Sequence, residues 1–267
     1  MNRFAAALAA LMIVGTALPA TAQDSSARAI VPHFTAPQAA AFSKQVERDL
    51  AQRGARVAIV FRAGRMRDQL PEGIAYTHGA FWVYRDIQTA DGKSQKGYAV
   101  YNLYAGDGKA WSKIESRLVQ DFPLDFTRGS TVNDMAVIVP SPEMQRRILA
   151  VIDSPTYQKV HNPEYSLVAN PWARKYQNCN NFMLNVIAAG VWNTDNPNQI
   201  TANLKAHYKP TVVKANGLVR FFGPIADQRL RTDDQDAVIR TATYESMAVF
   251  MRENKLLQDA YIFNYQP

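Results

Sequence analysis

The sequence predicts an α+β fold in which an antiparallel sheet packs against helices. Runs rich in Val, Ile and aromatic residues at 55–64, 78–87 and 97–106 are typical of strands. The last two are separated by a segment containing Asp-Gly, which favours a hairpin. Helical periodicity occurs before and after these runs, and no repeat or low-complexity linker interrupts the chain. We therefore expect residues 23–267 to form a single globular domain.

Residues 1–22 have the layout of a secretory signal peptide. Arg3 precedes an uncharged apolar run, and Ala20-Thr21-Ala22 fits a small-residue cleavage site. The run has roughly 16 residues, fewer than the ~20 that span a bilayer, and Pro19 interrupts it. We expect cleavage before Gln23, a periplasmic location, and no membrane span in the mature protein.

The first half of the mature chain combines helical and strand patterns. Residues 35–54 have helical spacing and end at Gly54, and the strand at 55–64 follows. After the 78–87 and 97–106 hairpin, residues 109–122 place Trp111, Ile114 and Leu118 on one helical face. These patterns predict a helix, a strand, a hairpin and a second helix.

The second half is predicted to be mainly helical. After a strand at 134–140, residues 141–154 begin with Ser-Pro-Glu, a helix-start signature. Residues 155–177 look irregular, and 212–223 suggest extended chain. Helices are predicted at 178–190, with Asn178 as cap and Gly190 as stop, at 196–208, and at 233–257.

The composition and motifs exclude several classes of function. The net charge is +7, but Lys and Arg are scattered, with the densest patch at 62–69. Nucleic-acid-binding proteins concentrate these residues along one element, so we expect no nucleic-acid partner. The sequence lacks His or Cys pairs at metal-ligand spacing, a phosphate-binding glycine loop and a G-x-S-x-G elbow. We therefore predict no metal and no cofactor.

Cys179 is the single cysteine, and it stands at the predicted start of a helix within YQNCNNF (176–182). The positive end of a helix dipole favours the thiolate, which is the nucleophilic form. First-turn N–H groups can stabilise an oxyanion, and Gln177 can add a side-chain donor. A buried structural thiol and an intermolecular disulfide are the alternatives.

A nucleophilic cysteine needs a base and a group that orients the base. Of the four histidines, His78 alone opens an apolar strand; the others are His33, His161 and His207. Centring the hairpin turn near residue 91 pairs positions whose numbers sum to roughly 182. Asn102 then lies near His78 on the neighbouring strand and can fix its tautomer. A structural histidine and a surface asparagine are the alternative interpretations.

Another pair, Asp121 and Asp125, has the residue type of paired catalytic carboxylates. Their four-residue spacing beside Phe-Pro favours a capped turn instead.

The order of these residues resembles that of a known superfamily. A His on a strand, a polar residue on the next strand and a downstream Asn-Cys helix start are similar to circularly permuted NlpC/P60 papain-like proteins. More closely, YNLY (101–104), QDFPLDF (120–126), ANP (169–171) and YQNCNNF resemble the DUF2145 family of predicted periplasmic proteins. Many relatives carry an acid after the cysteine, where this chain has Asn180 and Asn181.

The resemblance implies a permuted papain-like core and a thiol enzyme. Cys179 would be the nucleophile, His78 the base and Asn102 the orienting group in attack on an amide or ester carbonyl through a thioester. Cell-envelope peptidoglycan peptides or lipid acyl groups are the expected substrates. The alternative is a non-catalytic envelope module with a structural thiol. The oligomeric state is left open.

Overall fold

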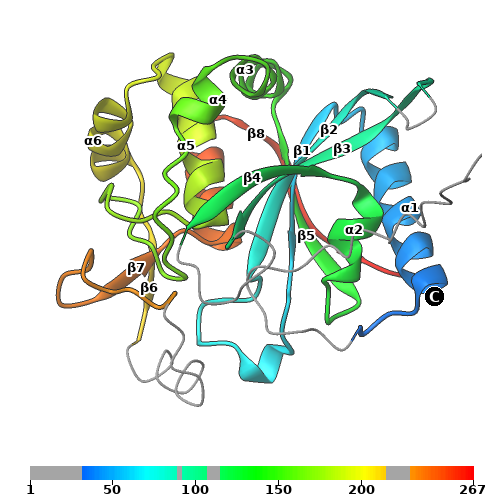
Figure 1. Ribbon diagram of the computed structural model, residues 1–267, viewed down its shortest axis with the longest axis horizontal. Helices are drawn as coiled ribbons and strands as arrows, with labels where there is room; N and C mark the ends of the chain where they lie inside the picture. The colour runs from blue at the N-terminus through cyan, green and yellow to red at the C-terminus, as the bar shows by residue number, and fades with distance from the viewer. Residues whose placement is uncertain (1–31, 89–91, 107–114, 215–228) are drawn as a thin grey trace, which may run out of the picture.

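The computed structural model describes residues 32–88, 92–106, 115–214 and 229–267. The predicted signal peptide at 1–22 therefore lies outside the described residues. A six-stranded antiparallel sheet has the order β4-β3-β2-β1-β5-β8 (Figure 1). Its strands are β1 Val57–Arg62, β2 His78–Gln88, β3 Ser94–Ala105, β4 Ser116–Asp121, β5 Asp134–Pro140 and β8 Leu257–Asn264. The predicted α+β class is confirmed.

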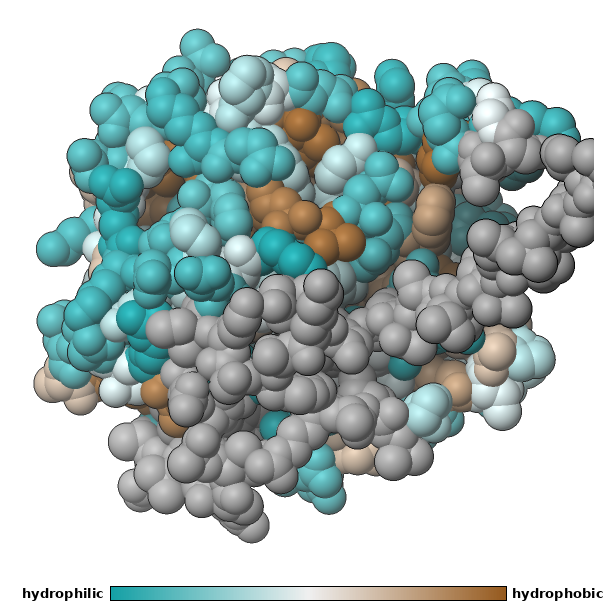
Figure 2. Space-filling model, in the orientation of Figure 1, coloured by the Kyte–Doolittle hydropathy of each residue, from teal (hydrophilic) through white to brown (hydrophobic). Residues whose placement is uncertain are grey.

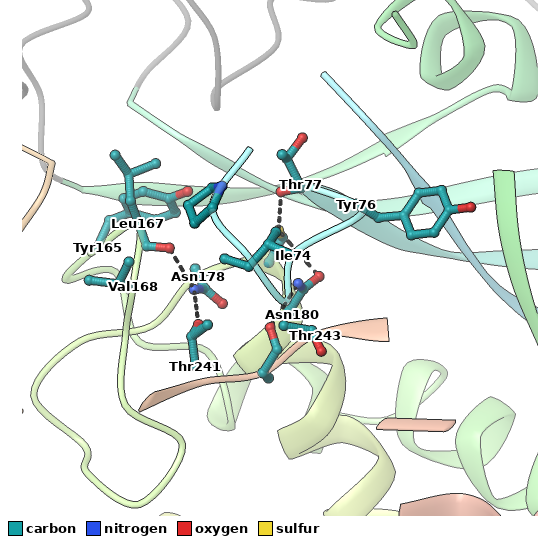
Figure 3. A pocket seen from close by; sticks show the side chains of 13 residues that line it. Ile74, Tyr76, Thr77, Tyr165, Leu167, Val168, Asn178, Asn180, Thr241 and Thr243 are labelled. Carbon is teal, nitrogen blue, oxygen red and sulfur yellow. Dashed lines mark hydrogen bonds between the residues drawn. The ribbon is translucent and has the colours of Figure 1, made fainter. Parts of the chain in front are cut away.

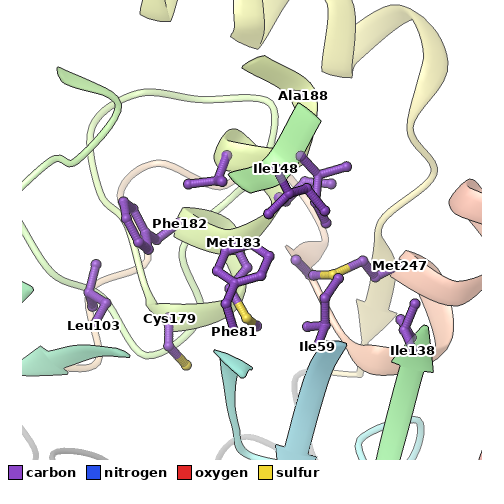
Figure 4. Close-up of a cluster of buried hydrophobic side chains, with 14 of the residues drawn as sticks. Ile59, Phe81, Leu103, Ile138, Ile148, Cys179, Phe182, Met183, Ala188 and Met247 are labelled. Carbon is purple, nitrogen blue, oxygen red and sulfur yellow. The ribbon is translucent and has the colours of Figure 1, made fainter. Parts of the chain in front are cut away.

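Helices cover both faces of this sheet, because the buried side chains of each strand alternate between the two faces. In β1, β2 and β3, even-numbered residues such as Val60 and Trp82 pack with α1 (Ala36–Gln52) and α2 (Pro123–Arg128). Odd-numbered residues of these three strands, such as Ile59 and Phe81, pack on the opposite face, where the largest hydrophobic cluster includes α5 (Cys179–Trp192). Figure 4 shows part of this cluster beneath α5.

The remaining elements surround the α5 face or lie at its margin. They are η1 Arg67–Gln69, α3 Pro142–Ile152, α4 Thr156–Lys159, α6 Pro197–His207, β6 Thr211–Val213, β7 Ile239–Thr241 and α8 Tyr244–Glu253. The short strands β6 and β7 form a separate two-stranded sheet. Hydrophilic residues cover most of the described surface in the view of Figure 2, and apolar residues emerge between them as small patches.

Local sequence signals explain where several elements begin. Thr35 and Gln38 form a capping box at α1, and the Ser141 side chain accepts a hydrogen bond from the backbone N–H of Met144 at α3. The Asn178 side chain does the same for Asn181 at α5. These three predicted helices are confirmed, as are α6 and the strands β1, β2, β3 and β5.

Helix α5 ends later than predicted. It continues through Gly190, and Asn193 ends it in the left-handed conformation at φ 48°. Asparagine tolerates this conformation at helix ends because its short polar side chain bonds locally.

The helix predicted at 109–122 is wrong where the chain is described. Residues 116–121 form strand β4, which pairs with β3 from Val100↔Asp121 to Ala105↔Ser116; residues 107–114 lie outside the described residues. The apolar spacing fits a helix, but the free edge of β3 offers hydrogen-bond partners to the backbone of these residues. The periodicity of the sequence does not reveal such partners.

The long helix predicted at 233–257 is also wrong in extent. Only Tyr244–Glu253 is helical, because Thr243 caps it and Lys255 turns the chain at φ 58°. Residues 239–241 before it form β7, and residues 257–264 after it form the edge strand β8. Within 212–223, residues 212 and 213 belong to β6 and Lys214 follows that strand, whereas residues 215–223 lie outside the described residues.

Among the described residues, no helix combines the length and the apolar character that crossing a bilayer requires.

Candidate active site

His78 and Asn102 lie on adjacent strands, and their side chains form a buried hydrogen-bonded pair. The β2–β3 register pairs Phe81 with Tyr101, so facing residue numbers sum to 182 (81 + 101), as the hairpin predicted. Nε2 of His78 lies 3.0 Å from Oδ1 of Asn102, and both residues are 0% exposed. The structure therefore brings these two predicted site residues together.

Aromatic rings hold the His78 imidazole in place. Tyr104 stacks on it at 5.2 Å between ring centroids with an interplanar angle of 6°, and Phe126 of α2 lies 5.6 Å away. Trp82 meets Phe126 edge-on at 5.7 Å. Because these rings are packed against each other, the imidazole has little freedom to rotate.

Asp121 extends the pair to a third strand. Its Oδ2 accepts hydrogen bonds from Asn102 Nδ2 at 3.0 Å and from the Tyr104 hydroxyl at 2.7 Å. Desolvation raises the pKa of Asp121, whereas the two hydrogen bonds and the positive charges of Arg117 and Arg62 oppose that rise. Asp125 lies in the first turn of α2, and its pKa is raised by burial first and then by the negative charge of Asp121.

Sequence reasoning did not assign Asp121 to this site. The error follows from reading residues 109–122 as a helix, which removed Asp121 from the edge of the sheet. The signal that pointed to it was QDFPLDF, one of the stretches that carried the family resemblance.

Cys179 is the first residue of α5, directly after the N-cap Asn178. Its Sγ lies 4.0 Å from the carbonyl oxygen of Thr77 and 3.7 Å from Oδ1 of Asn180, and the residue is 4% exposed. Thr77 immediately precedes His78, so the thiol lies beside the peptide group that joins them. Figure 4 shows the sulfur pointing from the helix start toward the sheet.

The Cys179 thiol and the His78 imidazole lie on opposite faces of the sheet. A Cβ on Gly79 would meet Met183 of α5 at 2.3 Å, so position 79 faces α5. Strand alternation then directs the His78 side chain toward α2, in agreement with its contact to Phe126. The two groups therefore approach the N-terminal end of β2 from opposite sides.

The amides beside Cys179 fasten the start of α5 to neighbouring segments. Asn178 Nδ2 donates to the Leu167 carbonyl at 3.1 Å and to Thr241 Oγ1 at 3.4 Å. Asn180 Nδ2 donates to the Ala242 carbonyl at 3.0 Å (Figure 3). The predicted helix cap, Asn178, is confirmed. The amide side chains on either side of Cys179 hold the start of α5 against these segments.

Gln177 is engaged elsewhere. Its Oε1 accepts the backbone N–H of Asn162 at 2.8 Å, and its Nε2 donates to the Val160 carbonyl at 2.9 Å. This amide holds the segment before α5 in place. Its predicted role as an oxyanion donor stays a prediction.

A pocket opens beside the thiol (Figure 3). Its lining includes apolar and aromatic side chains together with neutral amides and hydroxyls: Pro71, Ile74, Tyr76, Thr77, Tyr165, Leu167, Val168, Asn178, Cys179, Asn180, Thr241, Ala242 and Thr243. Among the described residues that line it, none is an acid, a lysine, an arginine or a histidine. The pocket is therefore suited to an uncharged group.

The other histidines have local partners. His161 Nε2 lies 3.0 Å from Ser116 Oγ, and burial lowers the pKa of His161. His33 packs on Phe34, and His207 packs on Trp192. Within the described part of the chain, no group of three or more His, Cys, Asp or Glu residues could hold a metal ion.

The chain matches the model of a protein family. The model of the DUF2145 family, described as uncharacterized proteins conserved in bacteria, matches residues 49–251. No curated protein and no solved structure is significantly similar to the chain.

Proposed function

The chain belongs to the DUF2145 family, and we propose that it is a cysteine hydrolase or acyltransferase of the bacterial periplasm. Cys179 is the nucleophile, His78 the general base and Asn102 the group that orients the base. The observation that carries the proposal is the buried His78–Asn102 hydrogen bond, next to the helix start that bears the thiol. A permuted papain-like arrangement accounts for this order of residues.

The reaction begins with transfer of the Cys179 proton to His78. The thiolate then attacks the carbonyl carbon of an amide or ester, and the carbonyl π electrons move to its oxygen. First-turn N–H groups of α5 face this oxyanion, since the N termini of helices present donors without intrahelical acceptors.

Collapse of the tetrahedral intermediate breaks the bond to the amine or alcohol, which takes its proton from the imidazolium. The acyl group remains on Sγ as a thioester. Water, or an acceptor alcohol or amine, then attacks the thioester, and the thiol is restored.

The lining of the pocket beside Cys179 indicates which kind of substrate group fits there. This lining is neutral and largely apolar. A fatty acyl chain or an uncharged part of a stem peptide suits such a surface, because burying an unpaired charge there would be costly. Substrates of both cell-envelope classes can present such a group. The lining favours substrates that are uncharged next to the scissile carbonyl.

A non-catalytic envelope module is the second candidate, and two observations favour it. Cys179 is 4% exposed within the main hydrophobic cluster, as a structural thiol would be. The His78 side chain also leaves β2 on the face opposite α5. Catalysis therefore requires contact between the imidazole and the thiol at the N-terminal end of β2.

The rate of Cys179 alkylation by iodoacetamide against pH tests the proposal. For the enzyme, we expect an apparent thiol pKa well below ~8.5, rising in His78→Gln. His161→Gln is the control, because His161 is a half-buried histidine that packs on Phe182 of α5 at 6.0 Å between ring centroids. An ordinary thiol profile that neither variant changes would reject the catalytic pair and support the structural thiol.

Hydrolysis and acyl transfer are then assayed directly. Cleavage of muropeptides or acyl esters that disappears in Cys179→Ala would identify the reaction. If the thiolate is reactive, the acyl donor that is consumed distinguishes peptidoglycan peptides from lipid acyl groups as substrates.

A further inference from the structure

A chain of polar side chains crosses β2, β3 and β4 on the face covered by α2. It runs from the His78 ring through the Asn102 amide to the Asp121 carboxylate, with distances of 3.0 Å at each step. Tyr104 supports both ends, since its ring stacks on His78 and its hydroxyl donates to Asp121. Asp121 is thus the outermost member of a continuous hydrogen-bonded row.

The chemistry of the row determines which atoms carry protons. A carboxylate only accepts hydrogen bonds, so the Asn102 atom that faces Asp121 must be its NH₂ group. The carbonyl oxygen of the same amide then faces His78. A carbonyl oxygen also only accepts, so Nε2 of His78 must carry the proton. In a neutral imidazole, Nδ1 is then the basic nitrogen.

We propose that Asp121 is a positioning residue that orients the Asn102 amide and thereby holds His78 as the Nε2-protonated tautomer. Its contribution to catalysis rests on the function proposed above, because Nδ1 is then the nitrogen that accepts the Cys179 proton. The effect on the tautomer does not depend on turnover. Without the carboxylate, the Asn102 amide can turn over and offer its NH₂ to His78, which favours a proton on Nδ1.

Several charged groups face Asp121, and they define the control. Arg62 of β1 and Arg117 of β4 attract its negative charge. Asp125 of α2 is an acid within electrostatic reach, and its pKa is raised by burial first and then by Asp121. Asp125→Asn removes a nearby negative charge and leaves the Asp121–Asn102 hydrogen bond in place. Asp121→Asn removes a charge of the same size and replaces a group that can only accept hydrogen bonds with an amide, which can accept or donate them.

The test is ¹⁵N NMR of the His78 ring in the full mature chain at a pH where the imidazole is neutral. We expect the wild type and Asp125→Asn to be protonated at Nε2, and Asp121→Asn to contain an increased Nδ1-protonated fraction. In parallel, Cys179 alkylation at neutral pH should slow about tenfold in Asp121→Asn, the size expected for loss of one charge-assisted hydrogen bond. Asp125→Asn should stay within twofold of the wild type.

Each outcome supports or overturns the positioning role of Asp121. Nδ1 protonation in the wild type, or identical ring spectra in both variants, would overturn the role of Asp121. The wild-type spectrum provides this test even where Asp121→Asn does not fold. An ordinary thiol profile together with the expected tautomer change would instead reject the proposed function and retain Asp121 as the group that orients Asn102.

Discussion

The close approach of α5 to β2 at Gly79 gives a prediction that tests how Cys179 reaches the strand of His78. A Cβ at position 79 would lie 2.3 Å from Cε of Met183, and 2.8 and 2.9 Å from Cδ1 and Cε1 of Phe61. Met183 can move the end of its flexible side chain. Phe61 is 0% exposed and packs edge-on against Tyr244 at 5.5 Å, so its ring has little space to move into.

We therefore expect Gly79→Ala to lower the free energy of unfolding by about 1–3 kcal/mol, the usual cost of overpacking a core. For a domain of this size, about 1 kcal/mol shifts Tm by roughly 2–4 °C, so the expected loss is about 2–12 °C. The strain should also move the start of α5 away from Thr77, with faster alkylation of Cys179 by neutral reagents as the consequence.

Gly97→Ala is the matched control on the neighbouring strand. A Cβ at Gly97 would meet Cδ1 of Ile87 at 3.5 Å, an ordinary contact. Glycine in a strand is less stable than alanine by about 0.5–1 kcal/mol, so this variant should be neutral or slightly stabilised.

Thermal melts of both variants, with a double-mutant cycle to Met183→Ala, complete the experiment. Removing the Met183 side chain should relieve part of the strain, so the double variant should lose less stability than the two single variants combined. Equal melting temperatures for Gly79→Ala and Gly97→Ala would refute the close packing of α5 on β2.

Three further predictions concern other parts of the structure. Gly129→Ala should cost about 1–3 kcal/mol of unfolding free energy, because its Cβ would overlap the buried Arg62 guanidinium; a urea titration measures this. Asn178→Ala should cost about 0.5–2 kcal/mol through loss of the α5 cap, whereas Asn196→Ala at α6 gives a more exposed comparison in the same titration. Lys175 and Tyr176 lower the pKa of Asp233 to about 2 from 3.8, so its stabilising effect is present above pH 3.8 and is lost as pH falls through about 2. The Tm difference between the wild type and Asp233→Asn should follow this window, and a difference unchanged at lower pH would contradict it.

Much of the candidate site was predictable because its signals are local. The Asp-Gly turn and the strand lengths set the hairpin register at a sum of 182, which placed Asn102 beside His78. Asn178 preceding a helical period placed Cys179 in the first turn of α5. In each case, neighbouring residues in the chain contain the information.

Tertiary structure decided the rest, because those features depend on partners distant in sequence. Residues 116–121 and 257–264 are edge strands, and their backbone hydrogen bonds exist only where β3 and β5 offer free edges. Pairing of β4 with β3 is what brings Asp121 to Asn102. The Gln177 amide likewise bonds to the backbone of residues 160 and 162, a contact that its own sequence neighbours do not indicate. Local sequence signals account for the strand that begins with His78 and the helix that begins with Cys179, whereas assembly of the sheet sets which polar groups surround them.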